Sequence, residues 1–421
     1  MALIAAATGV LFATHHGLSG PHDQFDLRIY FAAMHWWGDG NALYAYGKYD
    51  PVMGILGFTY PPFAAMLMSP MALLGWRTVQ VLTIASILAA AAVTVHLVLA
   101  ERFHIARRRL LPVVAGVTVA SFLLLPIRQT LQFGQVNLFL AVLVLFDVLV
   151  LTRRGSRLAG VGVGLAMAIK IVPGIFLLYL VLARQWRAAI TGAVTCAAAW
   201  LLTAVAMPGS SWEYFTSLLW DTRRVGILAS PSNQSVDGLL ARIVAPDQPG
   251  KLLFLAAVLI VALPAAQRIR AAVASGDTLA AVTITGLLGV LLSPVSWLHH
   301  CVWVLPAVVV IAHRVVTGAR RFPAIDGGVL GVLHDSAARR AALRLGGVIA
   351  LGLTGLAVFV TDTRDLLNLP MANLADLSAA EILGCSLQVL WMLAAVFLLP
   401  VLPNRAPDRR PSTDPLAAAA R

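Results

Sequence analysis

Charged residues are scarce in this sequence. Asp, Glu, Lys and Arg together make up 12% of its 421 residues, whereas hydrophobic residues make up 59%. A soluble domain carries about 25% charged residues, so this composition excludes a soluble enzyme. Apolar runs recur along almost the whole chain. They predict an all-α, polytopic integral membrane protein with one integral domain.

Cysteine is also scarce. Cys196, Cys301 and Cys385 lie within or beside apolar runs and form no CxxC pair. This spacing excludes a disulfide framework and a zinc site, so we interpret the three cysteines as small packing residues. The first residues, MALIAAATGVLFAT, lack the charged n-region and the cleavage site of a signal peptide. With about 13 apolar residues, this segment is short for a full span.

The net charge of +12 is placed in short loops between the apolar runs. This is the positive-inside pattern, which puts these loops in the cytoplasm and argues against a nucleic-acid partner. Attraction to anionic membrane lipids is a secondary effect. The basic loops are 102–109, 153–157, 184–187, 268–270, 320–321 and 339–340.

About ten to thirteen membrane helices are expected, some of them incomplete. The candidate segments are 2–14, 63–75, 78–100, 111–125, 138–151, 158–170, 173–183, 188–206, 252–267, 279–294, 301–316, 345–360 and 382–399. We expect one integral membrane domain over residues 1–402. Residues 403–421 are rich in Pro, Arg and Asp and predict a disordered cytoplasmic tail.

Two places in the chain cannot be counted as simple spans. Segments 158–170 and 173–183 are short and have basic loops at both outer ends, so we expect a bent hairpin with Lys170 at its tip. Segment 63–75 is also short. If it crossed the membrane fully, the basic loop 102–109 would fall on the wrong side.

The stretch DQFDLRIYFAAMHWW (23–37) predicts an amphipathic helix in the membrane interface, because one face is apolar and aromatic at helical spacing. That face comprises Leu27, Tyr30, Phe31, Met34 and Trp37, and the other comprises Arg28, Ala32, His35 and Asp39. Asp23 and Asp26 lie at its start. One acid can serve as an N-cap, and the other as a general base at the water boundary. We assign the base role to Asp26.

Polar residues gather in the loops on the side opposite the basic loops. In 126–140, Arg128 can clamp a phosphate with its guanidinium group, and amides suit sugar hydroxyls. The alternative is that these side chains only extend their polar groups to the membrane surface and bind no ligand. The polar residues of this stretch are Arg128, Gln129, Gln132, Gln135 and Asn137.

Tyr60 precedes Pro61 and Pro62, which set a rigid, extended start to the next helix. A simple helix start explains this stretch on local evidence. Lys170 is the only lysine inside an apolar run. Because an intramembrane charge is costly, Lys170 is a candidate for neutralising a lipid phosphate, the alternative being a structural partner for a carboxylate.

Two later loops carry further candidates. Between 221 and 242, the possible ligand groups are Asp221, Arg223, Arg224, Asn233 and Gln234. Asn233 is also the first residue of a glycosylation sequon, but a three-residue match is frequent by chance, so this interpretation has little weight. Between 291 and 306, His299 and His300 lie between Trp297 and Trp303. Adjacent histidines are poor joint metal ligands, so one of them is expected to hold a phosphate or orient a carboxylate. Trp297 is a candidate for sugar stacking.

Six stretches occur in order between residues 26 and 303: DLRIY, FTYPPFAA, FGQVN, AIKIVP, NQS and LLSPVSWLHHCVW. This set resembles the actinobacterial polyprenyl-phosphomannose-dependent α-1,2-mannosyltransferases of the glycosyltransferase C superfamily. The family includes the PimE-like enzymes and the lipomannan and lipoarabinomannan branching enzyme. The resemblance covers roughly three quarters of the chain.

The resemblance implies a multi-pass plasma-membrane mannosyltransferase with its active site on the periplasmic face. Its donor would be polyprenyl-phosphomannose, and its acceptor a mannosylated phosphatidylinositol glycolipid or a lipomannan. The family's essential aspartate falls on Asp26, and its histidine falls on His299 or His300. A β-linked donor and an α-linked product imply inversion, for which one base is enough. The implied reaction requires no metal or cofactor.

Two other functions compete with this one. A transporter or lipid-sugar flippase would share the helix count and Lys170. It should also show internal repeat symmetry in hydropathy, and the sequence has no clear repeat of this kind. A non-catalytic scaffold would not need polar loops gathered on one side.

Overall fold

The computed structural model describes residues 24–51, 53–245, 248–319, 336–362, 366 and 377–402, apart from the side chains at 222, 223 and 337. The predicted segment 2–14, Asp23, the side chain of Arg223, the basic pair 320–321 and the tail 403–421 lie outside them.

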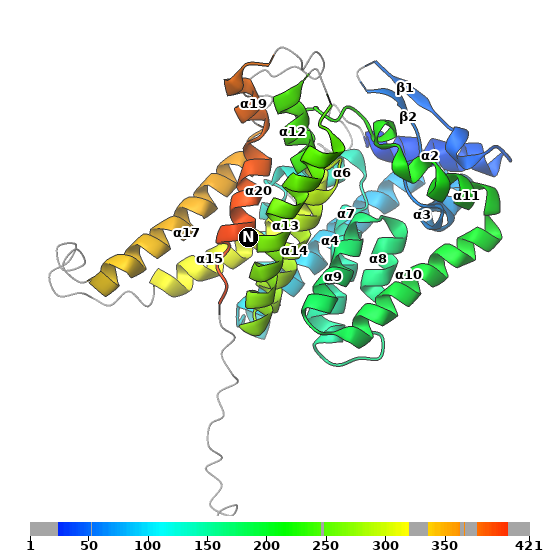
Figure 1. Cartoon of the computed structure of the whole chain (residues 1–421). Coiled ribbons are helices and arrows are strands. Elements are labelled where there is room, and N and C mark those ends of the chain that lie inside the picture. The colour runs from blue at the N-terminus through cyan, green and yellow to red at the C-terminus, as the bar shows by residue number, and fades with distance from the viewer. Residues whose placement is uncertain are drawn as a thin grey trace, which may run out of the picture.

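The described chain is a bundle of helices with a smaller layer of short elements across one end (Figure 1). The helices of the bundle are α4 (Trp76–Arg102), α5 (Arg107–Ser121), α6 (Leu125–Phe133), α7 (Asn137–Phe146), α8 (Val161–Ile169), α9 (Ile175–Leu182), α10 (Trp186–Ala206), α13 (Lys251–Ala274), α14 (Thr278–Leu292), α15 (Val304–Ala319), α17 (Ser336–Val360) and α20 (Leu387–Leu398). Helix α14 lies at the centre and is buried on all sides, as its uniformly apolar sequence requires.

The layer across one end, which we call the cap, contains short helices and one hairpin. Its elements are α2 (Phe25–Gly38), β1 (Lys48–Asp50), β2 (Gly54–Leu56), α3 (Pro62–Met68), α11 (Pro208–Thr216), α12 (Val236–Val244) and α19 (Ala379–Cys385). Strands β1 and β2 are antiparallel, with Tyr49 opposite Ile55. Short 3₁₀ or π segments connect the elements: η1 (Leu43–Ala45), η2 (Ser69–Leu73), η3 (Asp147–Thr152), η4 (Val172–Gly174), η5 (Leu218–Trp220), η6 (Thr222–Val225) and η7 (Leu298–Trp303).

The all-α, multi-pass membrane architecture is confirmed. Five helices are long and apolar enough to cross a membrane, or up to seven if the bent pairs α5–α6 and α19–α20 each count as one span. Four shorter apolar stretches account for the incomplete helices expected from the sequence: 62–73, 137–152, 172–182 and 278–292. Helix α3 has seven residues, or about 10 Å of helix, so it does not cross.

The basic loops 102–109, 153–157 and 184–187 lie at the end of the bundle opposite the cap. Arg153 donates to Glu101 at 2.5 Å, next to the loop 102–109. Arg102 pairs with Asp277 at 2.6 Å, which ties the same region to the turn before α14. The short α3 therefore solves the counting problem, because α4 begins at the cap and delivers loop 102–109 to the basic end (Figure 1).

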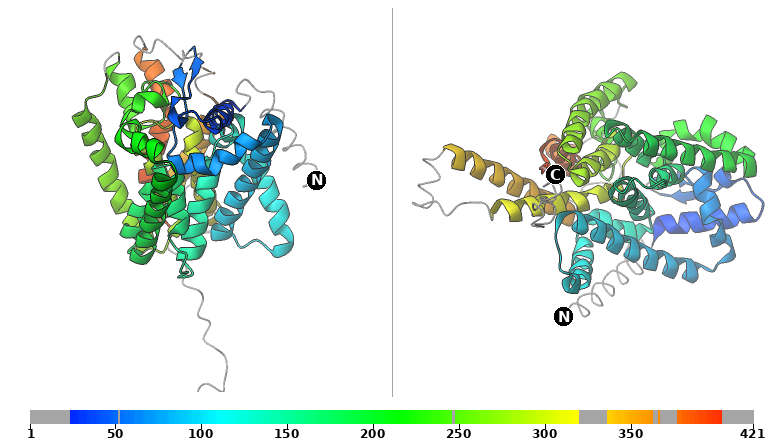
Figure 2. Two further views of the ribbon diagram at one scale, coloured as in Figure 1. Left: turned by 90° about the vertical axis from the view of Figure 1, so that its right-hand side faces the viewer. Right: turned by 90° about the horizontal axis from the view of Figure 1, so that it is seen from below.

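The amphipathic helix predicted over 27–37 is α2, which lies across the bundle axis (Figures 1 and 2). Leu27, Tyr30 and Met34 of the predicted apolar face are buried, and Ile29 and Ala33 widen that face. This face packs on the cap's own core, which includes Leu43, Phe58, Tyr60 and Ala64, so it is covered by protein.

The hairpin predicted around Lys170 is also present. Helix α8 ends at Ile169, Lys170 follows in an extended conformation, and η4 leads into α9. At the base, Arg187 Nη2 donates to the carbonyls of Gly155 and Ser156, both at 2.8 Å, so the two outer ends of the hairpin meet. Lys170 is thereby carried from the basic end into the interior of the bundle.

Candidate active site

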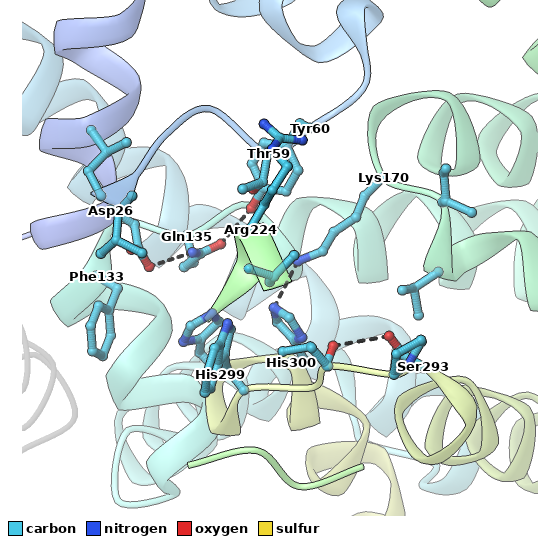
Figure 3. Close-up of a pocket in the computed structure, with 18 of the residues that line it drawn as sticks. Asp26, Thr59, Tyr60, Phe133, Gln135, Lys170, Arg224, Ser293, His299 and His300 are labelled. Atoms are coloured by element: carbon cyan, nitrogen blue, oxygen red, sulfur yellow. Dashed lines mark hydrogen bonds between the residues drawn. The ribbon is translucent and has the colours of Figure 1, made fainter. Parts of the chain in front are cut away.

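A cavity of about 920 Å³ lies beneath the cap. Its wall is built from α2, the β1–β2 hairpin, the residues before α3, the tip of the α8–α9 hairpin, η6 and the segment leading into η7. Figure 3 shows that Asp26, Gln135, Tyr60, Lys170, His299 and His300 project into one region of this cavity. Segments more than 270 residues apart in the sequence therefore meet around one space.

Asp26 lies in the first turn of α2 and lines the cavity. It is not the N-cap: Gln24 holds that position, without a side-chain hydrogen bond to the helix. Asp26 Oδ2 accepts a hydrogen bond of 2.6 Å from Gln135 Nε2. Burial raises the pKa of Asp26 to about 6, against smaller lowering effects of Gln135 and of the positive charge of Lys170. Asp26 is therefore a stronger base than an ordinary carboxylate, and it is still ionised at pH 7.

Gln135 contacts two tyrosines as well as Asp26. Tyr60 donates from its hydroxyl to Gln135 Oε1 at 2.9 Å, and Gln135 Nε2 donates to the Tyr30 hydroxyl at 3.0 Å. The Tyr30 hydroxyl donates to that of Tyr60 at 3.0 Å. All three side chains are buried. Tyr60 therefore has a place in the site beyond that of a simple helix start.

The position of Gln135 follows from the FGQVN sequence. Gly134 ends α6 with φ +70°, and a Cβ at this position would lie 2.6 Å from Leu27 Cβ. Only glycine fits both the left-handed backbone and this close approach. The backbone N–H of Gln24 also donates to the carbonyl of Gln132 at 2.7 Å. These contacts hold the start of α2 against the end of α6, so that Asp26 and Gln135 meet.

Lys170 places an ammonium group in the cavity, beside the Tyr60 ring. Its Nζ donates to Asn137 Oδ1 at 3.1 Å and lies 2.9 Å from His300 Nε2. It also lies 5.2 Å from the centre of the Tyr60 ring. In the described part of the chain, the ion pairs within 4 Å are Arg102–Asp277 and Arg153–Glu101, so no carboxylate pairs directly with Lys170. The alternative of a structural carboxylate partner is not what the structure shows.

The two histidines occupy different places. His300 contacts Lys170, as described above. The His299 ring packs on Phe133 with 5.3 Å between ring centres, and its carbonyl accepts a hydrogen bond of 3.0 Å from Asn137 Nδ2. Both rings line the cavity. Asn137 lies behind the wall, where it supports Lys170 and the backbone at His299.

Five of the residues predicted to bind substrate do not line the cavity: Arg128, Gln132, Asn137, Asn233 and Gln234. Their neighbour Gln129 does, because successive residues of α6 point in different directions. Asn233 and Gln234 are fully buried. The Asn233 side chain bonds the carbonyl of Leu228 and the N–H of Ser296, so it anchors a loop, and its burial argues against glycosylation.

The Gln234 side chain likewise bonds the backbone on both sides of the α19–α20 break, at Cys385 and Val389. Trp297 lines the cavity as predicted, and so do Asp221 and Arg224. Arg224 donates to the carbonyl of Phe58 at 3.1 Å and lies over the Tyr44 ring. Sequence reasoning missed Tyr30, whose place on the apolar face of α2 hid its hydroxyl, and also Thr59, Phe133 and Ser293.

The fold and the cavity together are those of a multi-pass membrane protein in which the Asp26 carboxylate and the Lys170 ammonium group line one cavity at the end of a helix bundle. Residues 58–294 match the model of glycosyltransferase family 87, and the chain belongs to this family.

Two relatives carry a named activity. The chain is 38% identical over 304 residues to the polyprenol-phosphate-mannose-dependent alpha-(1-2)-phosphatidylinositol mannoside mannosyltransferase of Mycobacterium tuberculosis, covering 68% of this chain and 70% of that protein. It is 34% identical to the corresponding phosphatidylinositol pentamannoside mannosyltransferase of Mycolicibacterium smegmatis, covering 70% and 71%. ArnT from Cupriavidus metallidurans, solved with undecaprenyl phosphate, aligns over 94% of this chain and 76% of its own at 16% identity, with a TM-score of 0.38.

Proposed function

We propose that this protein transfers mannose from polyprenol-phosphate-mannose to a phosphatidylinositol mannoside, forming an α-1,2 linkage. The names of the relatives support this donor, this acceptor and this linkage. They favour a phosphatidylinositol mannoside over lipomannan as the acceptor. Membership of a glycosyltransferase family argues against the transporter and flippase alternatives.

The observation that carries the proposal is that the Asp26 carboxylate and the Lys170 ammonium group line the same cavity. The acceptor hydroxyl oxygen attacks the anomeric carbon while Asp26 takes the hydroxyl proton. The bond from the anomeric carbon to the phosphate oxygen breaks, and the phosphate leaves with the electron pair. Attack from the side opposite the phosphate inverts the β-linked donor to an α-linked product, and a positioned base contributes about 10²–10⁴-fold.

The leaving group is already an anion, so it needs positive charge and not a proton. We assign the Lys170 ammonium group to the departing phosphate, and His300, whose Nε2 lies 2.9 Å from Lys170 Nζ, orients that group. Such preorganised groups stabilise charge where it develops in the transition state. Asp26 is raised in basicity by burial, with a pKa of about 6, and it meets the requirement for a base that is ionised yet effective near neutral pH.

The distribution of charge supports a cavity on the periplasmic side of the membrane. The basic loops, which gather at the end opposite the cavity, belong in the cytoplasm by the positive-inside rule. The cavity then opens to the periplasmic side, where a lipid-linked sugar donor replaces a nucleotide sugar.

The proposal is tested with purified protein, polyprenol-phosphate-mannose carrying labelled mannose, and a phosphatidylinositol mannoside. We expect a labelled glycolipid from which an α-1,2-mannosidase releases the label. In sealed vesicles, movement of the labelled donor across the membrane without a new glycosidic bond would contradict the proposal and favour a flippase.

A further inference from the structure

We infer that Gln135, Tyr30 and Tyr60 form a closed ring of hydrogen bonds that positions the Asp26 carboxylate. Gln135 is then a positioning residue for the base, and not a contact for the sugar as its sequence context suggested. This inference deepens the proposed function and rests on it, because it takes Asp26 as the base. It assigns a role to three side chains that the reaction itself does not use.

The hydrogens in this ring can be counted. The Tyr30 hydroxyl donates to Tyr60, the Tyr60 hydroxyl donates to Gln135 Oε1, and one Nε2 hydrogen of Gln135 returns to the Tyr30 hydroxyl, at 3.0, 2.9 and 3.0 Å. A primary amide has two N–H groups. The second points at Asp26 Oδ2, 2.6 Å away. Both donors of Gln135 are therefore used, which leaves its amide no hydrogen for a sugar hydroxyl.

The ring also fixes which way the amide faces. If the amide were turned over, Oε1 would face the Asp26 carboxylate and two acceptors would oppose each other. The Tyr60 hydroxyl, which already receives a hydrogen bond from Tyr30, has its own hydrogen free only for Oε1. Hydrogen bonds arranged in one direction around a ring strengthen one another. The ring therefore presents a single N–H to Asp26, in a fixed orientation.

This arrangement gives the two carboxylate oxygens of Asp26 different roles. Oδ2 is held by Gln135, and among the described residues no hydrogen bond reaches Oδ1. Asp26 lines the cavity, so Oδ1 is the oxygen that can take the proton of the acceptor hydroxyl. A carboxylate held at one oxygen keeps the other in a constant direction, which is what a base needs during the attack.

Burial gives a further reason to assign a role to the ring. Tyr30, Tyr60 and Gln135 come from three separate segments, and each is 5% exposed or less. Buried polar groups stabilise a fold little more than well-packed apolar groups of the same volume, even when all of their hydrogen bonds are made. A Phe, Phe and Leu set would fill similar space, so the polar atoms are best explained by what they do to Asp26.

Apart from tyrosines, the other charged or titratable side chains that line the cavity are Lys170, Asp50, Asp221, Arg224, His299 and His300, and of these Lys170 shifts the Asp26 pKa. Lys170 faces Asp26 from the hairpin tip, and its charge opposes the effect of burial on the Asp26 pKa. Tyr30 and Tyr60 stay neutral, because burial raises their pKa values well above the ordinary range. Lys48 on β1 lies over the neighbouring Phe25 ring. Among the groups that shift the Asp26 pKa, Gln135 is the one that donates a hydrogen bond directly to the carboxylate.

The test is a titration of Asp26 in Gln135→Leu and Tyr60→Phe. The hydrogen bond from Gln135 favours the ionised carboxylate, so its loss raises the pKa of Asp26 above the wild-type value of about 6. We expect the acid limb of kcat/KM to move up by about one to two pH units in Gln135→Leu. The shift in Tyr60→Phe should be smaller but of the same sign, because the amide loses the donor that orients it.

Infrared difference spectra of the full-length protein give the same titration without any turnover, with Asp26→Asn identifying the carboxyl band. Gln267→Leu on the exposed side of α13 and Tyr179→Phe, buried in α9, are the matched controls, and neither should move the titration. Unshifted titrations in both Gln135→Leu and Tyr60→Phe overturn the inference but leave the proposed function standing. A wild-type protein that transfers no mannose overturns the function, and the infrared titration still reports on the ring.

Discussion

At the residue scale, the function proposed for this protein depends on one carboxylate in the wall of a cavity. Burial moves the pKa of Asp26 from 3.8 to about 6, and Gln135 and Lys170 limit the rise. The first prediction concerns pH. Because the base must be ionised, kcat/KM in the wild-type enzyme should fall about tenfold per pH unit below pH 6. A flat profile between pH 4.5 and 7 would contradict the role of Asp26.

The second prediction concerns the leaving phosphate. Lys170→Met removes the positive charge beside His300, so we expect the rate of mannose transfer in a single turnover to fall about 10²–10³-fold. Lys251→Met, at the exposed start of α13, is the matched control and should retain the wild-type rate. A Lys170→Met enzyme within about threefold of the wild type would remove Lys170 from the reaction.

Sequence alone identifies part of the site at this scale. Asp26, Lys170 and the two histidines stand out because charged or titratable residues are costly next to apolar runs. Arg128 and Gln132 have the same chemistry, but α6 turns them away from the cavity. Asn233 and Gln234 also look like ligand groups in the sequence, but a buried loop uses them to satisfy its own backbone. Tyr30 is hidden for the opposite reason, since its ring belongs to an apolar face.

At the element scale, the hairpin of α8 and α9 and the cap helix α2 bring the two halves of the site together. Both could be predicted from the sequence: the hairpin from two short apolar segments between basic loops, and α2 from its helical periodicity. The 80° bend between α5 and α6 could not, because it depends on tertiary contacts. This bend turns the polar stretch 126–137 across the bundle and brings Gln135 under α2.

The third prediction tests the contact between α6 and α2. Gly134→Ala introduces a Cβ 2.6 Å from Leu27 Cβ at a residue with φ +70°. Gly40→Ala is the matched control, because Gly40 has φ +89° and no atom within 4 Å of the added Cβ. Both variants carry about 1–2 kcal/mol of backbone strain, and Gly134→Ala adds about 1–3 kcal/mol of overpacking.

Thermal unfolding in detergent should therefore show a larger loss of stability for Gly134→Ala than for Gly40→Ala. Mannose transfer should follow the same order, because Gln135 moves with Gly134. Equal melting temperatures in the two variants would show that the approach of α6 to α2 is looser than described.

At the scale of the whole molecule, charge separates the two ends of the bundle. The basic loops meet at one end, where Arg102 and Asp277 form a buried pair. The cavity and the cap occupy the other end (Figure 1). The sequence predicts this separation, since short basic loops alternate with polar loops along the chain. What it does not predict is which polar loops close over one cavity.

The fourth prediction fixes the orientation in the membrane. Tyr49→Cys places a thiol on the exposed β1–β2 hairpin, and Arg154→Cys places one in an exposed basic loop. The native cysteines are buried and should react slowly. In intact cells, or in spheroplasts where the outer envelope blocks the reagent, an impermeant maleimide should label Tyr49→Cys and spare Arg154→Cys until the plasma membrane is opened. The reverse pattern would place the cavity on the cytoplasmic side.

The most direct test of the account is the rate of mannose transfer by Asp26→Asn, measured beside Asp39→Asn. Asn keeps the size of the side chain but cannot take a proton, and Asp39 is an exposed residue at the far end of the same helix. The account predicts that Asp26→Asn loses at least about 10²–10⁴-fold in kcat while remaining folded, and that Asp39→Asn keeps the wild-type rate. An Asp26→Asn enzyme that transfers mannose as fast as the wild type would contradict the central claim.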